Sequence, residues 1–264
     1  MKFFHALKNI IKGSFLYPFL LRVKVWRQNE WKAQTHRKIL NSTAFFYTLS
    51  PILLVAISKA FKYQHLHRSG ATNFSEGHGY YEFGLFKGFS FWFAEQMSRD
   101  YVGNDFQFYG FDSFEGLPKS EVDGDYLYWR EGNYAASIEY VTEKLKDHGT
   151  DLKKVKLFKG FYSKHHFDSL RKSNSFLPIS ICVIDSDVYE SCVEVLDFIK
   201  NLLVPGSILL FDDYNFYDGA GNPKGDNHGE RRAMKEFEES NPTFSKEHLF
   251  DFGRNGVAFR VMGI

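Results

Sequence analysis

The stretch ISICVIDSDVYES, residues 179–191, decides the fold of this chain. Residues 179–185 form a continuous apolar run with β-branched side chains, which is typical of a parallel strand buried on both faces. Beyond it, residues 190–203 have the pattern of an amphipathic helix, and Pro205 with Gly206 marks its end. We therefore interpret this part of the chain as one strand–helix unit of an α/β fold.

The same alternation of strand and helix extends on both sides of this unit. The other predicted strands are 79–84, 107–112, 155–160 and 207–213, and the other predicted helices are 88–99, 135–146, 164–171 and 229–240. Two further apolar segments, 248–252 and 256–262, flank Gly253-Arg254-Asn255, which indicates a hairpin. The pattern predicts a doubly wound, Rossmann-like α/β sheet that is mostly parallel and ends in a C-terminal antiparallel hairpin.

Residues 1–76 have a different pattern and are predicted to form an N-terminal helical extension to an α/β domain of residues 77–264. Helical spacing covers 2–16, 19–40 and 43–64, and a polar connector follows. The first forty residues hold nine Lys and Arg against Glu30, a net charge of +8, whereas the whole chain carries +1. This basic segment is either a solvated helical face or a surface for a membrane, a lid or dimerisation.

Membrane insertion and disulfide bonding are both disfavoured. Residues 44–57 are apolar but Pro51 interrupts them, and a spanning helix needs about 20 apolar residues. The two cysteines, Cys182 and Cys192, form no CxxC pair, which fits a reducing compartment. We expect a cytoplasmic protein, with peripheral contact to the inner face of the membrane through residues 1–40 as the open alternative.

Acidic residues stand where four of the predicted parallel strands end: Glu82, Asp112, Asp185, and Asp212 with Asp213. The carboxyl ends of parallel strands share one edge of the sheet, and ligands bind there. Crowded carboxylates repel one another unless protons or a cation compensate, and oxygen ligands suit Mg²⁺ or Ca²⁺. The alternative is that each acid caps the helix that follows it.

The segment EFGLFKG, residues 82–88, connects the first strand of the sheet to a helix. Gly84 and Gly88 allow a sharp turn and a close approach to a ligand. Because the segment is not GxGxxG, an NAD-dependent oxidoreductase is disfavoured. Glu82, which precedes the glycines, suits a ligand with a cationic amino-acid part. Thirty residues later, Asp112 can accept both hydroxyl hydrogens of a ribose, or it can cap the turn.

Five motifs, in this order, resemble the macrocin/mycinamicin O-methyltransferase family: YEFGLFKG, YGFDSFEGLP, VKLFKGF, IDSDVYES and LLFDDYN. The likeness covers about residues 77–240. Members are class I, S-adenosylmethionine-dependent enzymes that need a divalent metal and methylate sugar hydroxyls on natural products. The resemblance implies an O-methyltransferase that uses S-adenosyl-L-methionine and Mg²⁺ or another divalent cation on a sugar or glycan acceptor. We expect a homo-oligomer with no nucleic-acid partner.

The resemblance also implies roles for particular residues. The methionine end of the cofactor would contact Glu82, Gly84 and Gly88, its ribose would contact Asp112 and Ser113, and its adenine would lie near Gly160 and Phe161. The metal would be held by Asp185, Asp212 and Asp213. Related catechol-type enzymes place a lysine where this chain has Val188, so the base is open among Asp187, His228, Glu230 and His165. We predict the catalytic set Asp185, Asp187 and His228.

The long polar segment 115–133 carries Tyr126, Tyr128 and Trp129 and is predicted to cover the acceptor. Loops of this length in compact domains are often functional, although an ordinary surface loop is the alternative. A second hypothesis keeps the fold but makes the chain a non-catalytic, membrane-associated binding protein, because the N-terminal segment is basic and aromatic. The retained acidic residues argue against that hypothesis.

Overall fold

The computed structural model describes residues 51–67, 77–101, 106–121, 130–215 and 225–264, which belong to a compact unit that begins at Ser50. Its strands are β1 (His78–Phe83), β2 (Phe106–Asp112), β3 (Val155–Lys159), β4 (Ile179–Ile184), β5 (Ile208–Phe211), β6 (Ser245–Phe252) and β7 (Gly256–Gly263). Its α-helices are α3 (Pro51–His67), α4 (Phe89–Tyr101), α5 (Ile138–Asp147), α6 (Lys164–Ser173), α7 (Tyr189–Ile199) and α8 (Gly229–Ser240). Two single 3₁₀ turns, η4 (Leu152–Lys154) and η5 (Gly225–Asn227), complete the elements of these ranges.

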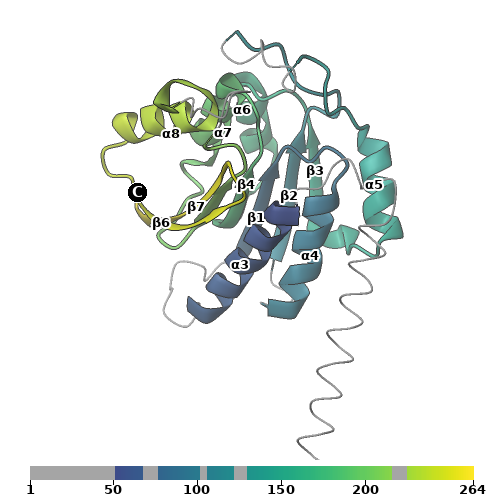
Figure 1. Cartoon of the computed structure of the whole chain (residues 1–264). Helices are drawn as coiled ribbons and strands as arrows, with labels where there is room; N and C mark the ends of the chain where they lie inside the picture. Colours follow the sequence, from purple (N-terminus) through teal and green to yellow (C-terminus); the bar gives the residue numbers. More distant parts are fainter. Residues whose placement is uncertain (1–50, 68–76, 102–105, 122–129, 216–224) are drawn as a thin grey trace, which may run out of the picture. The chain divides into compact units, whose positions relative to one another are not determined.

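The strands of the described ranges form one sheet in the order β3-β2-β1-β4-β5-β7-β6 (Figure 1). The first five are parallel to one another, and β7 runs antiparallel between β5 and β6. This confirms the predicted doubly wound sheet with its C-terminal hairpin. The chain moves from β1 outward to β2 and β3, then returns to place β4 on the other side of β1. The carboxyl ends of β1 and β4 therefore flank the switch point, where such sheets bind ligands.

Alternate residues of the strands face two different layers of helices. Tyr80 and Phe108 pack against Phe91 of α4 and, in the case of Tyr80, against Phe61 of α3. Residues on the opposite face of the same strands, such as Phe83 and Phe111, join a core with α6, α7 and α8. Because both faces of the central strands are buried, β4 and β5 read in the sequence as almost wholly apolar runs, whereas β1 also holds the buried His78 and Glu82.

Helix α3, which was predicted as part of the N-terminal extension, packs within this unit. Gln64 is 8% exposed, and its side-chain amide donates to the carbonyls of Ser180 and Gly206, both at 2.8 Å. These bonds join α3 to the segments that begin β4 and lead into β5. The predicted domain boundary at residue 76 stays a prediction, and residues 1–50, with the basic segment, lie outside the described residues. None of the described helices is long and apolar enough to cross a bilayer.

Helix ends follow local capping chemistry that the apolar pattern does not show. Helix α5 begins at Ile138 rather than at the predicted residue 135, because the Ser137 hydroxyl accepts the Tyr140 N–H and so caps the first turn. Ser163 caps α6 in the same way. Helix α7 ends at Ile199, and the turns that follow reach Pro205 and Gly206 before β5 begins.

We predict that Gln64→Leu destabilises the protein by about 2 kcal/mol, because the buried carbonyl of Ser180 and the partly buried carbonyl of Gly206 lose their donor. Lys62→Gln, at an exposed position of the same helix, is the matched control and should leave stability unchanged. Urea unfolding followed by circular dichroism measures both variants. A Gln64→Leu protein as stable as the wild type would show that α3 is not anchored through this side chain.

Candidate active site

The turn after β1 is fixed by the close approach of its backbone to the end of β4. Gly84 has φ +90°, and a Cβ at this position would lie 1.9 Å from the carbonyl oxygen of Asp185. The Asp185 N–H in turn donates to the Phe83 carbonyl at 2.9 Å, which continues the parallel pairing past the strand end. Only glycine fits at residue 84, and the turn is therefore held against the segment that carries the aspartates.

Asp112, at the end of β2, organises the same turn. Its Oδ2 accepts the backbone N–H groups of Leu85 at 2.7 Å and Phe86 at 2.9 Å, and its Oδ1 accepts that of Phe114 at 2.7 Å. Burial raises its pKa, and these amide donors work in the opposite direction. The carboxylate predicted to bind a ribose thus already holds the glycine turn, and its ribose role stays a prediction. The predicted partner Ser113 donates to the Gly116 carbonyl and builds a local turn.

Glu82 is completely buried at the end of β1. Its two carboxylate oxygens accept hydroxyl hydrogens from Tyr80 and Ser90, each at 2.5 Å. Burial raises the pKa of Glu82 from its ordinary 4.5 to about 7. Its predicted contact with the cofactor stays a prediction, because both carboxylate oxygens already accept hydroxyl hydrogens. Gly88, also predicted to line the cofactor, has φ +78° and lies against Val141 of α5.

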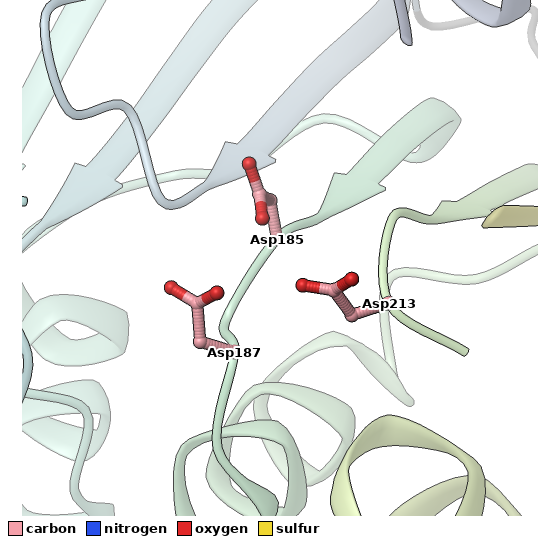
Figure 2. A group of neighbouring side chains, drawn as sticks. All are labelled: Asp185, Asp187 and Asp213. Carbon is pink, nitrogen blue, oxygen red and sulfur yellow. The ribbon is translucent and has the colours of Figure 1, made fainter. Parts of the chain in front are cut away.

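Three aspartates come together beyond the ends of β4 and β5. Asp185 and Asp187 follow β4, and Asp213 follows β5 on the neighbouring segment (Figure 2). One carboxylate oxygen from each of them lies within 4.8 Å of the others. Asp187 adopts φ +60°, a left-handed conformation that Asp tolerates better than most residues. The structure therefore gathers two members of the predicted metal set, together with the predicted base Asp187.

The carboxyl groups of this region are held in an unfavourable electrostatic environment. Burial raises the pKa of Asp185 well above its ordinary value, and Asp212, Asp187 and Asp213 raise it further. Burial also raises the pKa of Asp213, which the Asn255 amide at 3.0 Å opposes. Among the ion pairs of the described ranges, none joins Asp185, Asp212 or Asp213 to Lys or Arg. A cation would relieve this repulsion.

The three grouped aspartates fit a divalent cation of the hard, oxygen-binding type. They offer carboxylate oxygens from two loops, and oxygen is the ligand type that Mg²⁺ prefers. Asp212, the remaining member of the predicted metal set, is not part of this group. Its N–H donates to the Ile184 carbonyl at 3.1 Å, and burial together with Asp213 raises its pKa to about 7.

The remaining candidates for the base occupy different places. His228 is half-buried and is the N-cap residue of α8. Glu230, in the first turn of α8, is completely buried and accepts the backbone N–H groups of Ser186 and Asp213. His165 is exposed on α6, which follows the edge strand β3, three strand positions away from β4. Of these candidates, Asp187 is the one grouped with Asp185 and Asp213.

The predicted adenine side lies after β3. Gly160 has φ +155°, its N–H donates to the Asp112 carbonyl at 3.0 Å, and a Cβ there would lie 2.6 Å from the His166 ring. Phe161 beside it is 44% exposed. Tyr162, which was not singled out from the sequence, donates to the Phe111 carbonyl at 2.8 Å, and burial raises its pKa well above the ordinary value. Its position directly after the VKLFKGF motif was the available signal.

The predicted acceptor loop is tied down at its base. Leu117 donates its N–H to Asn133, and Gly132 donates its N–H to Leu117, so the two ends of the segment lie side by side. Glu190 of α7, another residue that was missed, accepts the Ser120 hydroxyl at 2.8 Å and the Glu121 N–H at 3.0 Å. Residues 122–129, with the predicted aromatic contacts, lie outside the described residues. Glu190 belongs to the IDSDVYES motif, which was the signal that could have found it.

A family model described as Macrocin-O-methyltransferase (TylF) matches residues 63–241, which is more than half of the chain. No curated protein sequence matches the chain.

Several solved structures share the fold. The O-methyltransferase NovP has a TM-score of 0.62 and 18% identity over 79% of each chain. CalS11, a calicheamicin methyltransferase also described as a TDP-rhamnose 3′-O-methyltransferase, has a TM-score of 0.61 and 20% identity over 89% of this chain and 92% of its own. An O-methyltransferase from Bacillus cereus in complex with SAH has a TM-score of 0.52 and 12% identity over 97% of each chain.

We predict that Gly84→Ala destabilises the protein by more than the about 1–2 kcal/mol that a left-handed alanine loses on conformational grounds alone. The added methyl group would collide with the Asp185 carbonyl and push β1 and β4 apart at their ends. Gly149→Ala is the matched control, because Gly149 has φ +77° but no atom within 4 Å of an added Cβ. Urea unfolding compares the two, and equal losses would contradict the close approach.

We also predict a pH dependence of stability that belongs to Glu82. The pKa of Glu82 is about 7 in the folded protein and 4.5 in the unfolded chain. Between these two pH values Glu82 is therefore protonated in the folded protein but ionised in the unfolded chain, so folding takes up a proton and rising pH lowers stability. The stability that Glu82 contributes is therefore complete below the lower value and lost above the higher one. In Glu82→Gln, the fall in unfolding free energy from about pH 5 to about pH 8 should be smaller than in the wild type by about 2–3 kcal/mol.

Urea unfolding at the two pH values measures this difference. Glu143→Gln, at an exposed position of α5, should keep the dependence of the wild type. Identical slopes for Glu82→Gln and wild type would mean that Glu82 ionises in the folded protein as it does in the unfolded chain.

Proposed function

Because the chain belongs to the Macrocin-O-methyltransferase family, we propose that it transfers the methyl group of S-adenosylmethionine to a sugar or glycan hydroxyl with the help of a divalent cation. The observation that carries the metal-dependent part is the group of Asp185, Asp187 and Asp213, whose oxygens lie within 4.8 Å of one another at the switch point. The sugar acceptor is supported by the family and by the description of CalS11 as acting on TDP-rhamnose.

The cofactor would lie along the turn after β1, which Gly84 holds close to the end of β4 and which Asp112 keeps in place through two backbone N–H groups. S-adenosylmethionine supplies a methyl group on a positively charged sulfur. The carboxyl-rich edge favours that charge, and the chain's main contribution to rate is to hold the acceptor oxygen in line with the methyl group. Gly160 and Phe161 would flank the adenine at the neighbouring strand end.

Asp185, Asp187 and Asp213 would hold the cation. When bound there, Mg²⁺ would orient neighbouring sugar oxygens and lower the pKa of the hydroxyl to be methylated. Asp187 is the proposed base, because it is the candidate grouped with the other two aspartates, and its oxygen that does not face the cation would take the proton. His228 remains the second candidate, at the start of the helix whose first turn reaches both aspartate loops.

The acceptor would enter beside the segment 115–133. Glu190 holds Ser120 and Glu121 at the start of α7, two residues beyond Val188 and close in sequence to Asp187. The base of the acceptor loop is thereby fixed to the same helix that follows the metal-binding aspartates. We propose that this segment selects the acceptor.

We predict methyl transfer that requires a divalent cation and the grouped aspartates. Full-length protein is incubated with radiolabelled S-adenosylmethionine and a panel of sugars, nucleotide sugars and glycolipids, with Mg²⁺ or with EDTA. Chelation or Asp213→Asn should lower the rate by about 100-fold or more, since a metal ion contributes several kcal/mol of charge stabilisation. Asp147→Asn, exposed at the end of α5, is the matched control and should retain activity.

The outcomes separate the parts of the proposal. Activity that survives exhaustive chelation would refute the metal-dependent step and leave a metal-independent methyltransferase. Folded protein that binds neither S-adenosylmethionine nor its demethylated product in isothermal titration would refute the methyltransferase function itself.

A further inference from the structure

Glu230 is the one completely buried carboxylate that contacts both loops bearing the grouped aspartates in the described part of the chain. It lies in the first turn of α8 and is 0% exposed. Its Oε1 accepts the N–H of Ser186 at 3.3 Å, and its Oε2 accepts the N–H of Asp213 at 3.1 Å. Each carboxylate oxygen therefore receives a donor from a different loop.

The two backbone amides that Glu230 accepts belong to the segments that carry the grouped aspartates. Ser186 lies between Asp185 and Asp187, and the other amide belongs to Asp213 itself. A single side chain thus fixes the segments that carry all three grouped aspartates, although it lies 44 residues along the chain from Ser186. Because carboxylate geometry at a metal site depends on such outer contacts, a change here would alter the spacing of the three oxygens.

The position also bears on charge. A fully buried carboxylate close to other carboxylates is unfavourable, and Asp213 and Asp212 oppose its ionisation. Burial raises the pKa of Glu230 well above its ordinary value, and the two amide donors work in the opposite direction.

We propose that Glu230 is a positioning residue that sets the spacing of Asp185, Asp187 and Asp213 by bridging Ser186 and Asp213, and thereby strengthens the binding of the divalent cation. This inference rests on the proposed function of the aspartate group as a metal site. Glu230 touches no reacting atom: it is buried and both its oxygens are engaged by backbone N–H groups. It is therefore a support for the site and not its base.

The test uses full-length Glu230→Gln, which keeps the size of the side chain but replaces one accepting oxygen by a donor that cannot pair with an N–H. The matched control is Glu239→Gln, the same change at an exposed position of the same helix. Isothermal titration with Mn²⁺ and, separately, with S-adenosylhomocysteine measures the two sites. Glu230→Gln should bind Mn²⁺ about 10–100-fold more weakly, the loss typical of supporting contacts, and bind S-adenosylhomocysteine within about two-fold of the wild type.

Two further measurements separate positioning from general stability. In hydrogen exchange, the amides of Ser186 and Asp213 should exchange faster in Glu230→Gln than in the wild type or Glu239→Gln. In the methyl-transfer assay, the Mg²⁺ concentration for half-activation should rise while the KM for S-adenosylmethionine is unchanged. If Glu230→Gln fails to fold, Glu230→Asp carries the same test, because it keeps the charge but is too short to reach both amides.

Each result decides the matter. Mn²⁺ binding by Glu230→Gln equal to that of the wild type overturns the inference and leaves the proposed metal site intact. Equal loss of Mn²⁺ and S-adenosylhomocysteine binding also overturns it, because Glu230 would then support the whole fold. Wild-type protein that binds S-adenosylhomocysteine but no Mn²⁺ refutes the metal site and this inference together.

Discussion

The contact on which the site depends is the approach of the Gly84 backbone to the carbonyl of Asp185. The two residues follow β1 and β4, the strands on either side of the switch point. Since a Cβ at residue 84 would lie 1.9 Å from that oxygen, only glycine fits at this position. One constraint brings the turn predicted to hold the cofactor and the aspartates predicted to hold the metal into the same small region. Methyl transfer requires such proximity, because the two reactants must meet in line.

Electrostatics sets the second constraint. Burial raises the pKa of every carboxyl group discussed at this edge whose shift is resolved, and several of them raise one another's further. A folded chain tolerates such crowding when the charges have partners, and stability is lost when they do not. Hydrogen-bond donors serve Glu82, Asp112 and Glu230. One carboxylate oxygen from each of Asp185, Asp187 and Asp213 lies within 4.8 Å of the others, a spacing that suits the proposed cation.

Most of the fold could be predicted from the sequence, because buried parallel strands such as 179–184 read as unbroken apolar runs and helices between them repeat regularly. The identity of the grouped aspartates could only partly be predicted. Asp212 and Asp213 are adjacent, and which of them faces Asp185 depends on the turn after β5. Asp187 joins the group through a left-handed backbone conformation, which spacing does not reveal. Glu230 could not be assigned its contacts, because they connect α8 to loops far away along the chain.

The acids gathered at this edge of the sheet therefore divide into two kinds. Asp112 accepts three backbone amides, Glu230 accepts two, and Glu82 accepts two hydroxyl groups, so each of these carboxylates shapes a turn or a loop. The grouped aspartates extend from the loops that these contacts hold. The capping alternative considered for the strand-end acids is thus close to the truth for Asp112, whose donors are backbone amides. The supporting acids fix the geometry of the loops, and the grouped aspartates that extend from those loops form the proposed cation site.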